Sequence, residues 1–230
     1  NLVSGEREHE NFGVHTVPYQ LVNEKLKDNL VESKKDECRS CGNRNLKRFL
    51  NLGLSPLANN LINNPEEDSD FYPLELNYCS NCHNVQLSCS VPSKKMFDNY
   101  LYVSSTSPTF RKHFEDAAIK YIYKFKLNEN SFVIDIGSND GIALKPLKER
   151  VINVLGIEPA TNIAILARDN NIPTINEYFT WNIIMKNNIK KADLVTCSNM
   201  FAHADNLKDV AINALSLLKS NGQFIIEVQY

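Results

Sequence analysis

The sequence predicts an α/β protein in which a parallel, doubly wound sheet follows a small domain built around four cysteines. In the second half of the 230-residue chain, short apolar segments alternate with helical patterns. Such alternation is typical of βαβ units, whose strands form a parallel sheet. Two Cys-x-x-Cys pairs lie in the first half, and a turn with two glycines, Asp135 to Gly141, follows the first apolar segment.

Composition and charge exclude several classes of protein. The chain has 25 Lys and Arg against 27 Asp and Glu, a net charge of -2, and 43% hydrophobic residues. A balanced charge argues against nucleic-acid binding, which normally leaves a basic footprint. The sequence holds no apolar run of about 18 residues and no secretory signal pattern. We therefore expect a cytoplasmic protein with neither nucleic-acid nor membrane partners.

The cysteine spacing defines the first domain, residues 37–93, which follows a polar tail or linker at residues 1–36. Two Cys-x-x-Cys pairs, separated by 37 residues, supply four thiolates to one tetrahedral ion. Gly42 permits the tight turn after the first pair. Disulfides compete with this interpretation, but the missing signal peptide favours reduced thiols. The sequence predicts a structural zinc site with the ligands Cys38, Cys41, Cys79 and Cys82.

The other candidate ligands have simpler interpretations. His83 adjoins Cys82 and is expected outside the zinc site. Cys89 and Cys197 lie on apolar stretches, where we expect buried free thiols. A redox-active pair is disfavoured because neither Cys-x-x-Cys opens a helix after a strand.

The second half begins with a connecting segment and helix, residues 94–127, and continues as the sheet domain, residues 128–230. Strands are expected at 132–137, 154–158, 172–175, 193–197 and 224–228. Helices are expected at 108–126, 142–150, 161–169, 181–187 and 207–219. The last strand runs to the end of the sequence without a turn, so we expect the chain to be a fragment.

The turn after the first sheet strand carries the cofactor signal. A dinucleotide fingerprint would need glycine at Asn139, so a nicotinamide site matches poorly. An acid, a glycine two residues later and another four further on resembles the first motif of class I S-adenosylmethionine-dependent methyltransferases. Glu158, 21 residues beyond Gly137, matches their second landmark, an acid whose two oxygens can accept both ribose hydroxyls. The alternative is a turn glycine and an unremarkable surface glutamate.

This resemblance implies a Rossmann-like methyltransferase sheet, incomplete at about five strands, that binds S-adenosylmethionine. In such folds the segment after the third strand surrounds the adenine, and the end of the fourth lies near the methyl group. The predicted cofactor-binding residues are Asp135, Gly137, Ser138, Asn139, Gly141, Glu158, Pro159, Glu177, Phe179 and Asn199.

The order of the motifs along the chain is similar to the nucleotide-sugar C-methyltransferases, including the C3-methyltransferases of branched deoxysugar biosynthesis. The shared segments are Cys-x-x-Cys-Gly, 54–60, 79–82 with 85–87, 102–107, 135–141, 156–160 and 199–203. The resemblance covers roughly Cys38 to Tyr230. It implies an N-terminal zinc domain, a central methyltransferase domain, a third domain absent here and a nucleoside-diphosphate keto sugar as substrate. It also places the principal tyrosine and histidine acid/base group after the fifth strand, beyond Tyr230.

Methylation at carbon needs a carbon nucleophile, which a base creates by removing a proton next to a ketone to give an enolate. Tyrosine, hydroxyl and amide groups suit a sugar nucleotide, and His203 is the candidate catalytic residue. Tyr100 and Tyr102 can instead simply alternate on a connecting strand. A methyltransferase acting on oxygen or nitrogen, or a non-catalytic zinc-stabilised binding fragment, stays open as an alternative. The predicted substrate-binding residues are Tyr100, Tyr102, Ser104, Ser105, Asn199 and His203.

Overall fold

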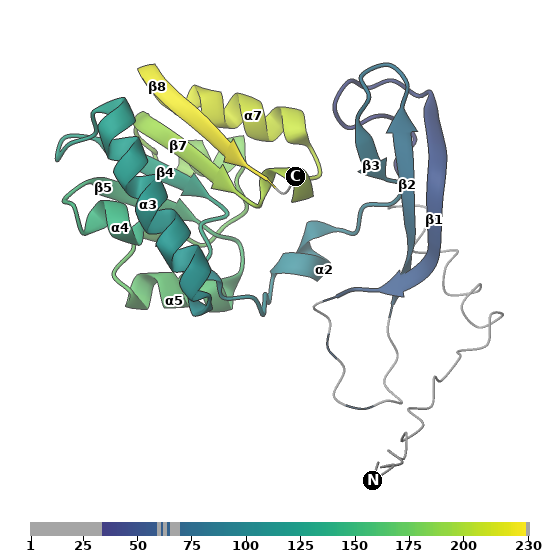
Figure 1. Ribbon diagram of the computed structural model, residues 1–230, viewed down its shortest axis with the longest axis horizontal. Coiled ribbons are helices and arrows are strands. Elements are labelled where there is room, and N and C mark those ends of the chain that lie inside the picture. The colour runs from purple at the N-terminus through teal and green to yellow at the C-terminus, as the bar shows by residue number, and fades with distance from the viewer. Residues whose placement is uncertain (1–33, 59–60, 62–63, 65–69, 229–230) are drawn as a thin grey trace, which may run out of the picture.

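The computed structural model describes residues 34–58, 61, 64 and 70–228, which form two domains (Figure 1). The predicted tail lies almost wholly outside the described residues, as do Asn59, Asn60 and Tyr230. The cysteine-rich domain is an antiparallel sheet of three strands in the order β1-β2-β3. Its strands are β1 (Leu46–Pro56), β2 (Phe71–Cys79) and β3 (Val85–Leu87).

The α/β domain contains a five-stranded sheet in the order β6-β5-β4-β7-β8, with every neighbouring pair parallel. The predicted parallel sheet is therefore confirmed. Asp135 pairs with Gly156 of β5 on one side and with Thr196 of β7 on the other. The strand order reverses at β4, and such a reversal opens a crevice at the carboxyl ends of the strands. The strands are β4 (Phe132–Ile136), β5 (Asn153–Ile157), β6 (Thr174–Ile175), β7 (Ala192–Ser198) and β8 (Leu218–Glu227).

Helices connect these strands. The helix α3 begins after Ser107, whose hydroxyl accepts a hydrogen bond from the Phe110 N–H, and Pro108 occupies its first turn. None of the described helices combines the length and the apolar character that crossing a membrane would require. The helices are α2 (Ser93–Phe97), α3 (Pro108–Phe125), α4 (Lys145–Lys148), α5 (Thr161–Asp169), α6 (Trp181–Lys186) and α7 (Leu207–Ser216), with 3-10 turns η1 (Ser104–Thr106) and η2 (Phe201–His203).

Two predicted helices are too long. The expected helix at 142–150 shrinks to α4, because the chain first turns back on the Gly141 carbonyl, which accepts from the N–H groups of Leu144 and Lys145. The expected helix at 207–219 ends at Ser216, because Leu218 already pairs with Ala192 of β7. Sheet pairing here overrides local helical periodicity.

Apolar side chains form one buried cluster on each face of the sheet. The central strand β4 is almost wholly buried, as expected for a parallel strand covered on both faces. Burial at roughly 25 cal/mol per Å² makes these clusters the main source of stability. They therefore fix the strand ends that carry the site. The most buried members include Val133, Leu144 and Leu194 on one face, and Ile134, Ile136, Ile157 and Val195 on the other.

Candidate active site

Four cysteine sulfurs of the cysteine-rich domain form one cluster, with all four ligand atoms within 4.8 Å of one another. The Sγ atoms of Cys38 and Cys82 lie 3.6 Å apart, as do those of Cys41 and Cys79. A tetrahedral zinc ion with Zn–S bonds of about 2.3 Å places its sulfurs about 3.8 Å apart. The four side chains therefore fit a zinc ion.

The two Cys-x-x-Cys turns have matching backbone hydrogen bonds. The Cys38 carbonyl accepts from the Gly42 N–H, and the Cys79 carbonyl accepts from the His83 N–H, at 2.8 and 2.9 Å. Both donors have positive φ angles, 73° and 63°. His83 thus occupies the turn position that Gly42 occupies in the first pair. Its ring Nδ1 forms a hydrogen bond with the Tyr78 hydroxyl. It lies outside the sulfur cluster, as expected.

Gly137 lets the chain after β4 pass close to the end of β7. Its φ is +70°, and an added Cβ would lie 2.8 Å from Cγ of Met200. The following hydroxyl, Ser138 Oγ, is buried without a hydrogen-bond partner among the described residues. A glycine without a side chain beside an unsatisfied buried hydroxyl, both on the cavity wall, is a suitable cradle for a polar ligand.

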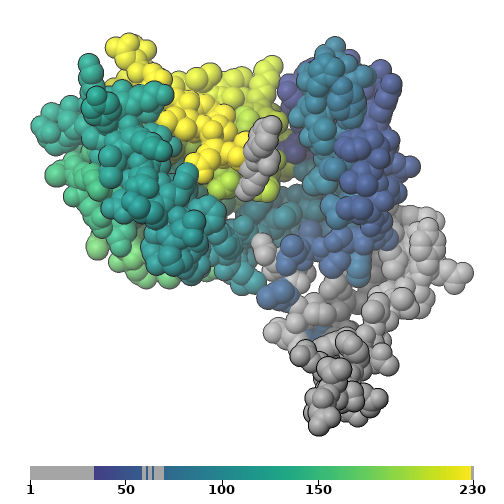
Figure 2. Space-filling model, viewed as in Figure 1, coloured from purple at the N-terminus to yellow at the C-terminus, as the bar shows by residue number. Residues whose placement is uncertain are grey.

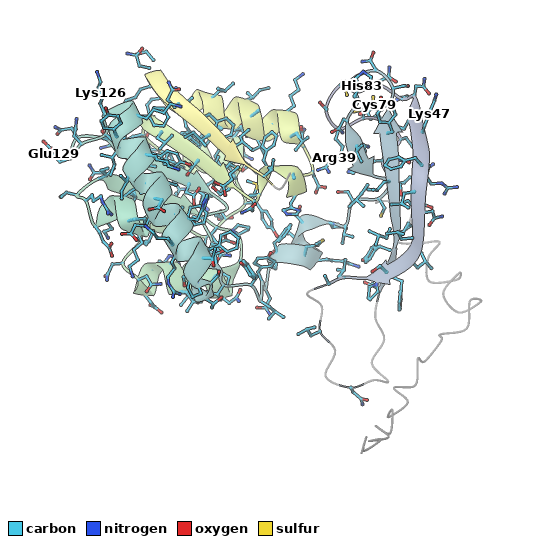
Figure 3. All side chains as sticks on the ribbon, in the orientation of Figure 1. Arg39, Lys47, Cys79, His83, Lys126 and Glu129 are labelled. Atoms are coloured by element: carbon cyan, nitrogen blue, oxygen red, sulfur yellow. The ribbon has the colours of Figure 1, made fainter. Side chains whose placement is uncertain are left out.

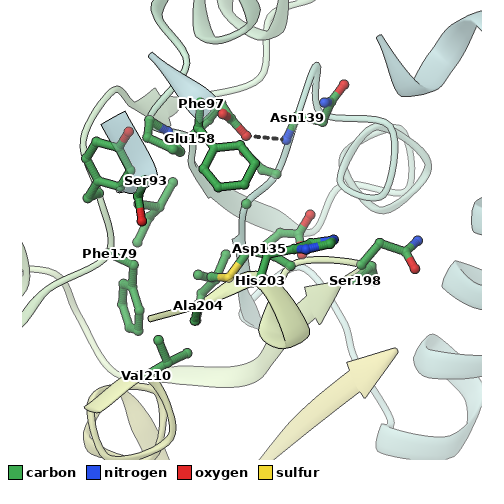
Figure 4. A pocket seen from close by; sticks show the side chains of 18 of the residues that line it. Ser93, Phe97, Asp135, Asn139, Glu158, Phe179, Ser198, His203, Ala204 and Val210 are labelled. Carbon is green, nitrogen blue, oxygen red and sulfur yellow. Dashed lines mark hydrogen bonds between the residues drawn. The ribbon is translucent and has the colours of Figure 1, made fainter. Parts of the chain in front are cut away.

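Glu158 lies at the carboxyl end of β5 and is only 6% exposed. Its two carboxylate oxygens each accept a backbone N–H at 2.9 Å, one from Ala160 and the other from Asn139; Figure 4 marks the bond to Asn139. Burial raises the pKa of Glu158, and these two hydrogen bonds oppose the rise. The carboxylate therefore ties the glycine turn to β5 and keeps lone pairs for further hydrogen-bond donors.

Asp135, at the end of β4, is almost completely buried and accepts a 2.7 Å hydrogen bond from Thr196 Oγ1. Desolvation raises the pKa of Asp135 to about 7, the Thr196 hydrogen bond lowers it, and the charges of Glu158 and Glu227 raise it further. A neighbouring cation would favour the ionised form. Asp135 is therefore suited to a positively charged ligand.

Asp135→Asn is expected to flatten the pH dependence of stability. The folded-state pKa of Asp135 is about 7 against an ordinary 3.8, so the folded protein binds the extra proton between these values. The free energy of unfolding then falls as pH rises through this window. Urea unfolding at pH 5 and pH 8 should show a loss about 2 kcal/mol larger in the wild type than in Asp135→Asn. Equal losses would contradict this assignment.

The strand ends open into a cavity of about 730 Å³. This volume is in the usual range of small-molecule sites. Figure 4 shows Asp135, Asn139 and Glu158 on the same cavity as Phe179 and His203. The predicted site residues that line it are Asp135, Gly137, Ser138, Asn139, Glu158, Pro159, Phe179, Asn199, Tyr100, Tyr102, Ser104 and His203.

Three predicted site residues do not line this cavity. Gly141 has a φ of +84° and packs closely against Ile172, because an added Cβ would lie 2.7 Å from Cγ1 of Ile172. Glu177 instead pairs with Lys186 at 3.3 Å. The carbonyl of Ser105 accepts a hydrogen bond from Arg111. The binding roles of all the predicted residues stay predictions, but these three have the weakest geometric support.

The segment with Tyr100, Tyr102 and Ser104 lies over the glycine turn without forming the connecting strand considered above. Asn139 holds it: its Nδ2 donates to the Tyr102 carbonyl at 3.1 Å, and its Oδ1 accepts from the Ser104 N–H at 2.9 Å. Asn162 binds both backbone groups of Tyr100. Asn139 thus joins the cofactor turn to the predicted substrate residues.

His203 lies at the rim of the cavity, in η2, with its ring centroid 6.4 Å from that of Phe97. Burial lowers the pKa of His203, and the positive charge of Arg39 lowers it further. At neutral pH the ring is therefore neutral and able to accept a proton. Asn199, with φ 55°, turns the chain at the end of β7.

Sequence reasoning missed several residues of the cavity wall. Asp205 accepts hydrogen bonds from Ser90 at 2.6 Å and Ser93 at 3.0 Å, which join the start of α2 and the chain before it to the segment that follows η2. Tyr178 donates to Asp98 at 2.7 Å, and that contact and burial raise its pKa. These partners are about 80 or more residues apart in sequence, so no local pattern signals them.

Comparison with known proteins places this geometry in a family. A family model described as a methyltransferase domain matches residues 110–230, more than half of the chain. The chain belongs to this methyltransferase family. A second model, described as "Putative zinc binding domain", matches residues 38–97. The predicted pairing of the two domain types is confirmed, as are the predicted cofactors S-adenosylmethionine and zinc. The exact domain boundaries stay a prediction.

One curated relative is C-methyltransferase NovU from Streptomyces niveus, which is 28% identical over 199 residues. The alignment covers 85% of this chain and 47% of NovU, so the chain spans about half the length of that relative. Among solved structures, the plantazolicin methyltransferase BpumL with SAH has a TM-score of 0.44 at 17% identity, over 54% of this chain and 49% of its own. CalS10, an amino pentose methyltransferase from Micromonospora echinaspora with bound SAM, also has a TM-score of 0.44 at 17% identity. That match covers 57% of this chain and 59% of CalS10.

Proposed function

We propose that the protein is an S-adenosylmethionine-dependent C-methyltransferase that acts on the keto-deoxysugar of a nucleoside-diphosphate sugar. The observation that carries the proposal is the similarity to a C-methyltransferase over 85% of the chain, a span that includes both domains. The motif resemblance described above adds the nucleotide-sugar class. The reduced cysteine cluster agrees with a cytoplasmic location.

In this proposal the end of the sheet holds the cofactor, which supplies an electrophilic methyl group when bound. Glu158 binds the ribose hydroxyls, and Gly137 allows the backbone close approach. Tyr100, Tyr102 and Ser104 position the sugar above the same cavity. Holding a carbon and a methyl group in line is itself worth several kcal/mol of the barrier.

His203 is the candidate acid/base residue within this chain, in addition to the principal acid/base group that the family resemblance places beyond Tyr230. Its lowered pKa keeps the imidazole neutral, so Nδ1 or Nε2 can take a proton from the carbon next to the ketone. Catalysis by a positioned base of this kind typically contributes 10²–10⁴-fold. The resulting enolate carbon is the nucleophile that C-methylation requires.

Proton exchange tests this proposal. The protein is incubated with SAH and a nucleoside-diphosphate keto-deoxysugar in deuterium oxide, and NMR follows the proton next to the ketone. We expect exchange, slowed about 100-fold or more by His203→Gln and unchanged by His113→Gln, the same substitution at an exposed histidine that pairs with Glu227 and does not line the cavity. Methyl transfer to the sugar with full retention of that proton would contradict the enolate route.

A further inference from the structure

We propose that Arg39, from the first Cys-x-x-Cys turn, binds the diphosphate of the substrate, so that the cysteine-rich domain supplies part of the substrate site. This inference rests on the proposed function, because the diphosphate comes from the substrate class argued above. It gives the zinc-binding domain a direct part in recognition.

The cavity itself offers no cation to a diphosphate. Its wall contains four carboxylates, Asp135, Glu158, Asp205 and Asp209, and neither lysine nor arginine among the described residues. A nucleoside diphosphate brings at least two negative charges, which these acids would repel at the low dielectric of a cleft. Such a substrate therefore needs a positive charge from beside the cavity.

Arg39 does not itself line the cavity, but it lies on the adjacent domain. Figure 3 shows it on the side of the cysteine-rich domain that faces the α/β domain, and Figure 2 shows the two domains side by side. The hydrogen bonds of Ser90 and Ser93 to Asp205 join the domains at the cavity, which Ser93 and Asp205 line. The charge of Arg39 also acts on His203 at the rim.

The guanidinium of Arg39 has an unpaired edge. Its Nε and Nη2 atoms are shielded from solvent, and neither has a hydrogen-bond partner among the described residues. These two N–H groups form the edge that binds a carboxylate or phosphate in the bidentate mode. A buried N–H group without a hydrogen-bond acceptor destabilises the protein. An oxyanion that accepts hydrogen bonds from Arg39 would remove this destabilisation. Because these atoms are shielded, the Arg39 side chain must change rotamer to present this edge to a ligand, and rotamer changes are common on binding.

The remaining described arginines differ, because each has a partner within the protein. Three form ion pairs with glutamates, and two donate to backbone carbonyls, so none has an unpaired shielded edge. These residues are Arg44, Arg48 and Arg150 in the first group, and Arg111 and Arg168 in the second.

The backbone of Arg39 is fixed on both sides. Cys38 precedes it in the sulfur cluster, and its own N–H donates to Gln86 Oε1 at 2.8 Å. Gln86 is 6% exposed, and its Nε2 donates to the Glu37 carbonyl at 3.0 Å. Gln86 is therefore a positioning residue for Arg39.

Calorimetry with UDP, GDP and dTDP as probes tests the assignment. Arg39→Gln should bind the tightest of them about 10- to 100-fold more weakly than the wild type, as expected for loss of charged hydrogen bonds. Arg39→Lys should recover part of the affinity, because lysine keeps the positive charge but cannot form the bidentate hydrogen bonds of a guanidinium. Arg44→Gln, at an exposed arginine of the same segment, is the matched control and should bind normally. Binding of SAH and zinc should not change in Arg39→Gln.

The outcomes separate the two proposals. Wild-type affinity in Arg39→Gln would overturn the role of Arg39 and leave the proposed function intact. Loss of zinc or SAH binding in both Arg39 variants would also overturn it, because the residue would then be structural. If the wild type binds SAH but none of the three diphosphates, the nucleotide-sugar substrate fails, and the assignment of Arg39 fails with it.

Discussion

Cys79→Ser is expected to release the zinc ion and unfold the cysteine-rich domain. The Cys79 side chain is fully buried, and its sulfur is one of four that surround a single point. Structural zinc sites contribute about 10–16 kcal/mol of apparent binding free energy, so loss of a ligand removes much of the folding free energy of a small domain. Metal analysis of the purified variant should give well under one zinc per chain.

The matched control is Cys89→Ser, which changes a buried cysteine outside the cluster. It should keep its zinc. The α/β domain has its own two buried clusters, so Cys79→Ser should still bind SAH while losing affinity for a nucleoside diphosphate. A variant that keeps one zinc per chain would contradict the four-cysteine site.

Glu158→Gln is expected to weaken SAH binding by about 100-fold. The carboxylate accepts two backbone N–H groups at 2.9 Å, and an amide would turn an NH₂ group toward one of these donors. Hydrogen bonds to a charged group are worth about 1.5–3 kcal/mol each, and an unpaired buried donor costs a similar amount. Calorimetry with SAH measures the change directly.

The same substitution at Glu177 is the control. Glu177→Gln alters an acid that pairs with Lys186 and does not line the cavity, and it should bind SAH as the wild type does. Because burial raises the pKa of Glu158, wild-type affinity should be lost, as pH falls, at a higher pH than an ordinary glutamate would give. If Glu177→Gln weakened SAH binding more than Glu158→Gln does, Glu177 and not Glu158 would be the main cofactor-binding acid.

Much of the fold follows from local pattern. The helix expected at 161–169 is α5, with the same ends, and the apolar run at 132–137 is β4. One error arises from a local turn on the Gly141 carbonyl, and the other arises where pairing with a distant residue decides, at Leu218, which joins β8 through Ala192 of β7. Periodicity along the chain does not contain that information.

The site divides in the same way. Fixed spacing predicted the four zinc ligands, and the glycine turn with Glu158 predicted the cofactor end of the cavity. The contacts of Asp205 with Ser90 and Ser93 join residues 115 and 112 positions apart, and the two unpaired nitrogens of Arg39 are evident only from the packing around them. No sequence separation is diagnostic of such contacts, so they required the structure.

Methylation of the sugar at carbon is tested most directly by following the transferred methyl group. The protein is incubated with S-adenosylmethionine whose methyl carbon carries an NMR-active isotope, together with a nucleoside-diphosphate keto-deoxysugar. We expect the labelled methyl group to appear bonded to a ring carbon of the sugar, with loss of the proton from that carbon. A methoxy or N-methyl signal would contradict the account.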